Sequence, residues 1–411
     1  MNNLTEVWTK LLGTTEGEYA YADTIAISND GFIYTAITSR GDFNGTTHKG
    51  NSDAHLIKYS SNGELLWSKE LASTSSDDIF DIEIDNNNNI YVAYRNGTSD
   101  IIKKFDKDGS LIWDIVTHSN GGNTQLNRIE ISNDNFLYAG GNTKESINGD
   151  TIKGGRDIFL SKYNLDSSHI WTKVYASSEN DSLFGIESST EGSIYISGST
   201  YGDLNGEINS GDRDAYISKL SSEGIVIWTK LIGTSGYESG GNITISKSGN
   251  IYLSSVTTGN LHDQINTGGS DGFLVKYNSN GARQWTKLFG TESADSIYGL
   301  TSDENNNLYI VGHTSSDIWI TKFSNNGIKQ WSDLYGSDKY EEAKTILFSE
   351  NFLYVNGATK GNLGGQINQS TNEWDYDAFL IKYSLNQSTD NLSPTITGPS
   401  GSAGDSTSNK S

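Results

Sequence analysis

Hydrophobic and polar residues alternate along short runs through most of the chain, and clusters of Gly, Asn, Asp or Ser separate these runs. Alternation with a period of two is typical of β-strands. The unit is clearest in one segment, where strands are expected near 241–246, at 251–256 and at 272–277. An Asn-Gly turn, a strong β-hairpin signal, then leads to a fourth strand that carries Trp285.

The same unit occurs seven times, at spacings of about 57 or 46 residues. A tyrosine marks the second strand of each unit and a tryptophan the fourth, and we expect these tryptophans to be core residues. The tryptophans are Trp8, Trp67, Trp113, Trp171, Trp228, Trp285 and Trp331. Repeats of this length that consist only of strands predict an all-β fold, a seven-bladed β-propeller with four-stranded antiparallel blades.

The first tryptophan strand, residues 5–12, precedes every complete set of strands, and the last set ends at Tyr383 without a tryptophan strand after it. We therefore expect the N-terminal strand to pair into the last blade, which closes the ring and removes two free strand edges. The propeller is predicted over residues 4–383. Residues 384–411 are rich in Ser, Thr and Gly and contain both prolines, so they are expected to be a linker or the truncated start of a following domain.

The amino-acid composition limits the kinds of partner and site that the chain can have. With 29 basic and 51 acidic residues the net charge is -22, which disfavours nucleic acid. The absence of cysteine excludes disulfides, thiol catalysis and cysteine zinc sites. No apolar run approaches the roughly 20 residues of a membrane span, so membrane insertion is not expected. The first ten residues lack the basic and apolar regions of a signal peptide.

One pattern in the repeat is more specific than general propeller patterning. It begins at Asp214, continues with a Lys five residues later and a Gly four residues before Trp228, and is followed by Gly-Asn-Ile-Tyr at 249–252. It resembles the bacterial seven-bladed β-propeller repeat family, SBBP, as does the loop Gly-Asp-Leu-Asn-Gly at 202–206. The resemblance implies a monomeric module of a longer secreted or cell-surface bacterial protein, without a shared catalytic site.

Ten residues after each tryptophan stands an acidic residue or, in one unit, Asn123. This position lies between the outermost strand of one blade and the innermost strand of the next, so we expect a ring at one mouth of the central channel. Two alternatives remain open: each side chain caps its own turn, or the ring binds a hard cation such as calcium. The carboxylates are Glu18, Asp77, Asp181, Glu238, Asp295 and Glu341.

A second acidic position opens the third strand of every unit, and a lysine follows it. Because this position is identical in all blades, we expect a structural role, with the lysine stem packed between blades. The residues are Asp53, Asp100, Asp157, Asp214, Asp271, Asp317 and Asp377.

The connections between the second and third strands are long in five units and short in units two and six. This asymmetry predicts two raised arcs with a groove between them, since binding sites favour loops on a rigid scaffold; the alternative is that these are ordinary solvated loops. The predicted border consists of Asp42, Asn44, Asp150, Asp203, Asn205, Glu207, His262, Asp263 and Trp374.

Repeats specify a scaffold rather than a chemistry, so two functions stay open. The preferred one is a non-enzymatic module that binds a glycan or a protein in adhesion or scaffolding, with calcium as a candidate stabiliser. The alternative is a propeller enzyme, a polysaccharide lyase or glycoside hydrolase, which needs an acid/base pair about 5 to 10 Å apart across a cleft. A redox-cofactor propeller is a third alternative.

Overall fold

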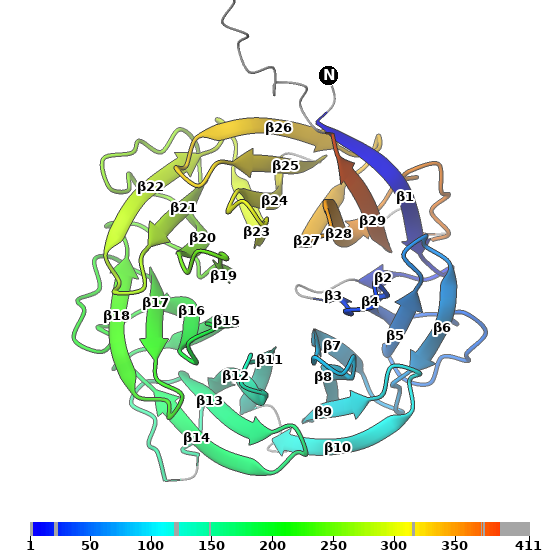
Figure 1. The fold of residues 1–411 in the computed structure, drawn as a ribbon, viewed down its shortest axis with the longest axis horizontal. Coiled ribbons are helices and arrows are strands. Elements are labelled where there is room, and N and C mark those ends of the chain that lie inside the picture. The colour runs from blue at the N-terminus through cyan, green and yellow to red at the C-terminus, as the bar shows by residue number, and fades with distance from the viewer. Residues whose placement is uncertain are drawn as a thin grey trace, which may run out of the picture.

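The computed structural model describes residues 3–19, 24–118, 123–147, 149–314, 317–370, 372 and 375–386. These residues form 29 β-strands in seven sheets arranged as blades around a central channel (Figure 1), which confirms the predicted seven-bladed propeller. In each blade the first strand lies at the channel and the fourth at the rim. The described residues include no helix that is long and apolar enough to cross a membrane.

Six blades are built from strands that follow one another in the chain. Blade 1 contains β2 (Glu18–Tyr19) with β3 (Ile25–Ile27), β4 (Ile33–Ser39), β5 (Asp53–Tyr59) and β6 (Leu65–Glu70). Blade 2 contains β7 (Asp77–Ile84), β8 (Ile90–Asn96), β9 (Ser99–Phe105) and β10 (Leu111–His118). Blade 3 contains β11 (Thr124–Ile131), β12 (Phe136–Thr143), β13 (Asp157–Asn164) and β14 (His169–Tyr175). Both β2 and β3 pair with β4, so the innermost position of blade 1 is shared by two short strands.

Blades 4 to 6 repeat the same order from channel to rim. Blade 4 contains β15 (Asp181–Ser188), β16 (Ile194–Thr200), β17 (Asp214–Leu220) and β18 (Val226–Ile232). Blade 5 contains β19 (Ile243–Ile245), β20 (Ile251–Thr257), β21 (Asp271–Tyr277) and β22 (Arg283–Phe289). Blade 6 contains β23 (Asp295–Ser302), β24 (Leu308–Thr314), β25 (Asp317–Phe323) and β26 (Lys329–Tyr335).

Blade 7 contains both ends of the described chain. It consists of β27 (Glu341–Ser349), β28 (Phe352–Thr359), β29 (Asp377–Leu385) and β1 (Leu4–Leu12). The pairing of β1 with β29 runs antiparallel from Leu4 opposite Leu385 to Leu12 opposite Ala378, so the predicted ring closure is confirmed. Strand β29 extends two residues beyond the predicted end at 383, and residues 387–411 lie outside the described part of the chain.

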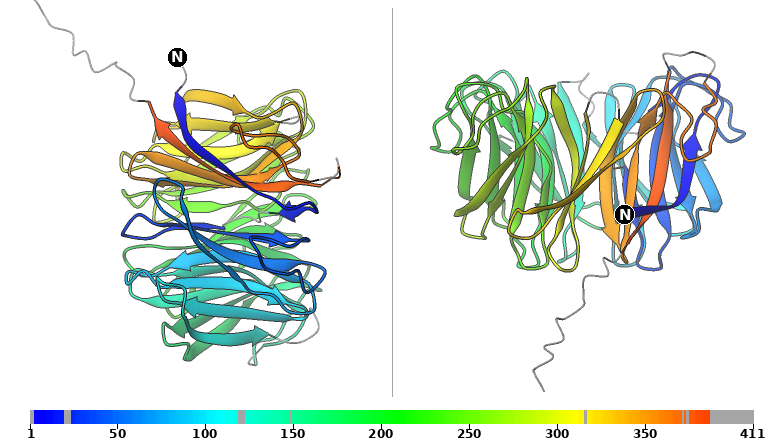
Figure 2. Two further views of the ribbon diagram at one scale, coloured as in Figure 1. Left: turned by 90° about the vertical axis from the view of Figure 1, so that its right-hand side faces the viewer. Right: turned by 90° about the horizontal axis from the view of Figure 1, so that it is seen from above.

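The two faces of the ring differ. One face, here called the loop face, carries the connections from second to third strands and from each blade to the next (Figure 2). Strand β1 begins and β29 ends on the opposite face (Figure 2).

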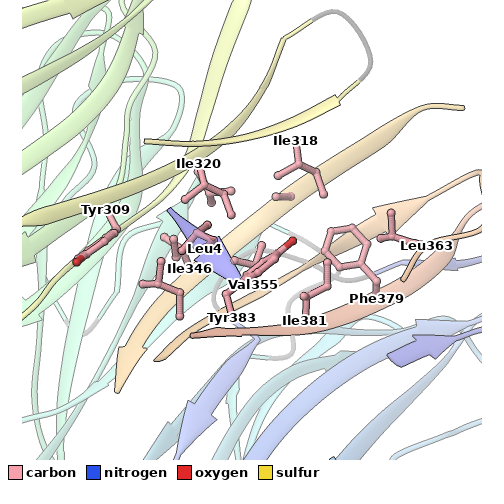
Figure 3. Close-up of a cluster of buried hydrophobic side chains, with 13 residues drawn as sticks. Leu4, Tyr309, Ile318, Ile320, Ile346, Val355, Leu363, Phe379, Ile381 and Tyr383 are labelled. Carbon is pink, nitrogen blue, oxygen red and sulfur yellow. The ribbon is translucent and has the colours of Figure 1, made fainter. Parts of the chain in front are cut away.

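The core lies between blades rather than inside them. In Figure 3, Ile318 and Ile320 of blade 6 pack against Val355, Phe379 and Ile381 of blade 7. Because a blade is covered by a neighbour on each face, its middle strands are buried on both sides, as in β5, where every residue is buried. This is why the middle strands are apolar runs while the outer strands alternate.

The repeated tryptophan joins neighbouring blades. The indole Nε1 of Trp228 donates to the carbonyl of Ser279, 3.3 Å away, in the hairpin turn of the next blade. The ammonium of Lys219 donates to the same oxygen at 3.2 Å. Three further carbonyls receive a tryptophan and a lysine together: Ser61, Leu165 and Asn325. The tryptophans are half-buried, so the expectation of core residues is corrected to one of contacts between blades.

The turn glycine and the strand tyrosine complete this contact. A Cβ on Gly281, whose φ is +77°, would lie 2.9 Å from the ring of Trp228, so only glycine fits both the backbone and the space. Tyr195, in the second strand, meets Trp228 edge to face with centroids 5.9 Å apart. Blade 7 has no hairpin turn between its last two strands, since β1 comes from the other end of the chain. Among the described residues Trp331 accordingly has no turn carbonyl as acceptor.

This exception provides a matched test. Trp285→Phe removes the bond to Asn325, whereas Trp331→Phe removes a similar ring volume and no such bond. We expect the first variant to lose about 1 kcal/mol more unfolding free energy than the second, the typical net value of one hydrogen bond. Urea unfolding of both variants measures the difference, and equal losses would contradict the role of the indole N–H.

Candidate functional site

Five of the six carboxylates predicted at the channel mouth open the first strands of their blades, and Glu238 precedes β19 by five residues. Each is at most 3% exposed, and each accepts a hydrogen bond from the backbone N–H four residues before it. For Glu238 the donor is Thr234, at 2.8 Å. These contacts match the turn-capping alternative. In the described residues no three His, Cys, Asp or Glu side chains converge as a metal site requires, and calcium at this ring stays a prediction.

The residues predicted to border a groove are held by their own blades. Asn44 Nδ2 donates to Ser68 Oγ at 2.7 Å, and Asn205 Nδ2 donates to Thr229 Oγ1 at 3.0 Å. Ser68 and Thr229 follow the tryptophan of the outermost strand, so these loops fold outward over the rim (Figure 1). His262 Nδ1 lies 2.9 Å from Thr286 Oγ1 in the same position of blade 5.

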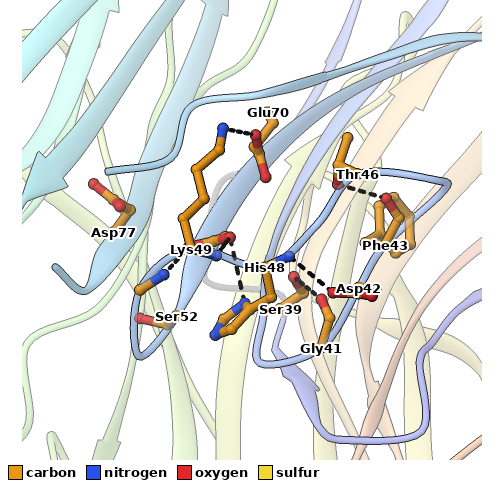
Figure 4. Close-up of polar contacts among 12 residues, drawn as sticks. Ser39, Gly41, Asp42, Phe43, Thr46, His48, Lys49, Ser52, Glu70 and Asp77 are labelled. Carbon is orange, nitrogen blue, oxygen red and sulfur yellow. Dashed lines mark hydrogen bonds and ion pairs between the residues drawn. The ribbon is translucent and has the colours of Figure 1, made fainter. Parts of the chain in front are cut away.

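The remaining members of that set also brace their loops. Asp42 accepts a bond from the His48 backbone at 2.8 Å (Figure 4), and Asp203 accepts the equivalent bond from Asn209 at 2.9 Å. The others are Asp150, bonded to the Val174 backbone; Glu207, paired with Lys230; and Asp263, in a left-handed turn at φ +65°. Trp374 lies outside the described residues. A groove across the face stays a prediction, since these contacts each lie within one blade.

A pocket that the sequence-based search missed lies on the loop face, beside the channel mouth. Its volume is about 320 Å³, at the small end of ligand pockets, which span roughly 300–1,000 Å³. We call it the mouth pocket. It is lined by Phe80 of blade 2; Gln125, Asn127, Arg128, Asn142 and Arg156 of blade 3; and Ser182, Leu183 and Phe184 of blade 4.

Asparagine side chains make the pocket floor rigid. Asn127 Nδ2 donates to the Leu183 carbonyl and Asn142 Oδ1 accepts from the Leu183 N–H, both at 2.9 Å. These bonds tie blade 3 to blade 4 beneath the pocket. The half-buried rings of Phe80 and Phe184 stand at its two ends.

The pocket is also basic, in a chain that is acidic overall. Arg156 is half-buried, and its guanidinium makes no ion pair or hydrogen bond with the described residues. Arg128 Nη1 donates to the Asn127 carbonyl at 2.9 Å. Arg95 lies over Phe80 with its guanidinium carbon 5.3 Å from the ring centroid. Two of the six arginines of the chain thus line the pocket and a third lies beside it, a grouping that arises from the stacking of blades and that the sequence alone does not show.

The channel below the pocket is narrow and acidic on one side. Its cavity of about 210 Å³ is lined by the first strands of all seven blades. Blades 2, 3 and 4 contribute Glu83, Glu130 and Glu187 at the same strand position. Burial raises the pKa of Glu130 to about 7, although its bond from the Ser188 backbone, at 2.9 Å, acts in the opposite direction.

A second group of functional side chains lies on the loop face where blade 6 has its short connection. The ring of His313 stacks on Tyr298 with centroids 5.6 Å apart, and its Nε2 lies 3.4 Å from the hydroxyl of Tyr340. Lys344 Nζ lies 4.5 Å from the ring centroid of Tyr298 and 2.5 Å from Glu342 Oε1. Burial lowers the pKa of His313 and Lys344 lowers it further, against the opposing effect of Glu342.

Known proteins share parts of this chain. Residues 227–262 and 284–318 match the model of the SBBP β-propeller repeat, which confirms the predicted resemblance. Regulatory protein FlaEY of Caulobacter vibrioides is 24% identical over 346 residues, which cover 69% of this chain and 35% of FlaEY. An uncharacterized WD repeat-containing protein of Acanthamoeba polyphaga mimivirus is 23% identical over 256 residues, 62% of this chain and 14% of that protein. The chain thus spans only about a third or less of these relatives.

Solved structures share the fold at low sequence identity. Polysaccharide lyase Uly1 has a TM-score of 0.52 at 10% identity, covering 89% of this chain and 90% of the lyase. An ulvan lyase bound to -[GlcA(1-4)Rha3S]- has a TM-score of 0.55 at 10% identity, over 88% and 96%. Drosophila Plexin A in complex with Semaphorin 1b has a TM-score of 0.51 at 10% identity, over 94% and 88%. At such identities the likeness shows a propeller and nothing finer.

The buried histidines give a prediction for pH dependence. Burial lowers the pKa of His55 and of His118 to about 4. The unfolded chain takes up these protons below about pH 6.5, so the stability they contribute is present above that pH and is lost as the pH falls. We expect NMR titration to show both rings neutral from pH 8 to pH 5. A midpoint near 6.5 for either ring would contradict the burial.

Proposed function

We propose, from the mouth pocket, that this β-propeller is a non-enzymatic binding module. The proposed ligand is a glycan that carries a carboxylate or sulfate group. The observation that carries this proposal is Arg156, a half-buried residue that lines the pocket and whose guanidinium has no protein partner among the described residues.

The pocket has the donors and surfaces that a sugar requires. The rings of Phe80 and Phe184 offer apolar faces on which a pyranose packs. Gln125 and Asn127 add amide groups for hydroxyls. A guanidinium binds carboxylate or sulfate through two parallel hydrogen bonds, the strong kind of polar contact. Together these groups favour a sugar with an acidic substituent over a neutral one.

The net charge of -22 limits how acidic this ligand is. The field of the whole chain repels a densely charged polymer, and salt screens that repulsion only beyond about 10 Å at 0.1 M. One free guanidinium balances one acidic group. The proposed ligand is therefore a glycan with isolated acidic groups rather than a heavily sulfated chain.

The setting of this module is part of the proposal. We place it outside the cell or on its surface, as a monomeric part of a longer chain, with calcium as a candidate stabiliser. The strands that adjoin the rest of such a chain leave the face opposite the mouth pocket, which supports an arrangement in which the pocket is displayed (Figure 2).

Two charge-matched variants test the ligand. Arg156→Gln should weaken binding of a singly acidic oligosaccharide about 10- to 100-fold, the value of a charged hydrogen-bonded contact. Arg283→Gln removes the same charge from an exposed position on β22 and should leave affinity unchanged. Calorimetry with neutral, singly acidic and heavily sulfated oligosaccharides measures this. Equal affinity of wild type and Arg156→Gln would sink the proposal.

A second candidate function, cleavage of an acidic polysaccharide by elimination, rests on the His313 cluster. In this reaction a base removes the proton next to a sugar carboxylate, a double bond forms, and the C–O bond breaks as an acid protonates the leaving oxygen. His313, with its lowered pKa, is the candidate base, and the hydroxyl of Tyr340 is the candidate acid. Lys344 is the nearby cation that can face the carboxylate. The carboxylates of the two acidic rings are poorer candidates for a hydrolase, because they are buried.

Product formation separates the two candidates. An eliminating enzyme creates a conjugated double bond, which absorbs in the ultraviolet, and His313→Ala should abolish that signal without changing the affinity at Arg156. Binding of an acidic oligosaccharide without any such absorbance would remove the lyase and leave the binding module.

A further inference from the structure

Two buried acidic residues meet at the junction between successive blades. One opens the third strand of a blade, and the other opens the first strand of the next blade or, in the case of Glu238, shortly precedes it. A backbone hydrogen bond places them side by side: the N–H of Asp181 donates to the Arg156 carbonyl, just before Asp157, at 2.6 Å. The pairs are Asp53 with Asp77, Asp157 with Asp181, Asp214 with Glu238, Asp271 with Asp295, Asp317 with Glu341 and Asp377 with Glu18.

The two carboxyl groups of a junction share one small space. A Cβ on Gly290 would lie 2.4 Å from an oxygen of Asp271 and 3.0 Å from an oxygen of Asp295. At Gly336 the corresponding distances, to Asp317 and Glu341, are both 2.8 Å. At these two junctions the glycine that follows the outermost strand therefore leaves room for the pair, whereas Ala72 and Ala176 occupy the same position before Asp77 and Asp181.

Five junctions each contain one carboxyl oxygen that is buried and has no hydrogen-bond partner in the described structure. These are the Oδ1 atoms of Asp77, Asp181, Asp214, Asp271 and Asp377. The acid across the junction is better satisfied: Asp157, for example, accepts from the backbones of Lys153 and Gly154. An ionised carboxylate only accepts hydrogen bonds, and leaving one of its buried oxygens unpaired costs about 1–3 kcal/mol or more.

The junction between blades 2 and 3 contains a single acidic residue, and it shows how a buried carboxylate is compensated when the second acid is missing. There the first strand of blade 3 opens with Thr124 after Asn123, so Asp100 has no acidic neighbour in this position. Instead Arg95 donates to Asp100 Oδ1 at 2.8 Å, and the Leu126 N–H donates to Oδ2 at 2.7 Å. Where the second acid is missing, a guanidinium supplies the positive charge and the donor.

We propose that each of the five acidic pairs with an unpartnered oxygen holds one shared proton, in a contact that we call a carboxyl clasp. The protonated oxygen is the one without a partner, and it donates to the ionised acid of the adjoining blade. A proton needs only these two oxygens, whereas calcium takes six to eight oxygen ligands. The ring therefore takes up protons when it folds, and a rise in pH removes them from the blade junctions.

The direction of the pKa shifts agrees with the geometry. Burial raises the pKa of Asp181 and of Asp377 to about 6, and that of Glu18 to about 7. Unfolded carboxyls titrate near about 4, so clasp stability is fully present below that pH and is lost as the pH rises through 6 to 7. Each clasp then lowers the folding equilibrium constant by up to tenfold per pH unit. The buried histidines act in the opposite direction over part of this range.

The clasp between blades 3 and 4 is the best one to test. The charged and titratable groups that face it are Lys153, beside Asp157, and the phenol of Tyr216, beside Asp181. Arg156 adjoins it through the backbone and extends into the mouth pocket. Burial raises the pKa of Asp157 as well, although the backbone bonds from Lys153 and Gly154 and the charge of Lys153 favour its ionised form. The unpartnered oxygen belongs to Asp181, so the proton is assigned to Asp181.

Asp181→Asn replaces the protonated acid with an amide that donates in the same direction. We expect this variant to match the wild type in urea unfolding at pH 5, to be more stable than the wild type at pH 8, and to show a pH slope smaller by one proton. Asp100→Asn is the matched control, because it disrupts an ion pair with Arg95 and should lose stability at both pH values.

Three outcomes would overturn the proposal. The first is a loss of stability in Asp181→Asn that is equal at pH 5 and pH 8, which would mean that an ionised Asp181 is required. The second is a calcium-dependent rise in the wild-type melting temperature at pH 8 that Asp181→Asn abolishes, which would assign a cation to the junction. Should the variant fail to fold, infrared spectra of the wild type decide: buried carboxylic acids should absorb at pH 6, and absence of that band is the third outcome.

Discussion

The ring depends on the contact between a tryptophan and the hairpin turn of the next blade. Four turn carbonyls receive an indole N–H and a lysine ammonium together, as Ser279 does from Trp228 and Lys219. In three of these turns a glycine makes the approach possible, because a Cβ there would lie about 3 Å from the indole, whereas Ser167 takes the left-handed position in the turn that contains Leu165. This contact lies at the outer part of the blade, while the apolar core fills the space between the middle strands. Where this contact is made, a blade is fixed to its neighbour both near the rim and through the apolar core.

The seven blades share one backbone structure, so side chains that bind a ligand or carry out a reaction are expected at positions that differ between blades. The loops that looked most variable in the sequence prove to be braced against their own outermost strands. The blades differ near the channel in the side chains of their first strands. Some blades have small or polar residues at positions where others have Phe80, Arg128 or Phe184, which line the mouth pocket. The mouth pocket arises there because three first strands converge, and only blade 3 contributes arginine to it. Function in this molecule is thus expected where the repeat is uneven and the strands are close.

Many acidic residues of the chain have a structural role. Many of its carboxylates are turned inward, where they cap turns and meet in pairs at the blade junctions. A shared proton in each clasp reduces the charge that the folded ring carries at neutral pH below the formal value of -22. The arginine at Asp100 shows the same requirement met by a side chain. Proton uptake at the junctions and ligand binding at the mouth pocket are separate properties, although Arg156 touches both places.

The sequence by itself determined the strands, the number of blades and the closure of the ring. These depend on local alternation, on turn residues and on a repeat that must pair its leftover first strand with its incomplete last blade, as β1 and β29 do. Only the tertiary structure decided which side chains meet. Asp157 and Asp181, or Phe80 and Phe184, stand far apart in the chain and come together through the stacking of blades. The same stacking turned the predicted channel-mouth carboxylates into buried pairs, because each blade covers the start of the next.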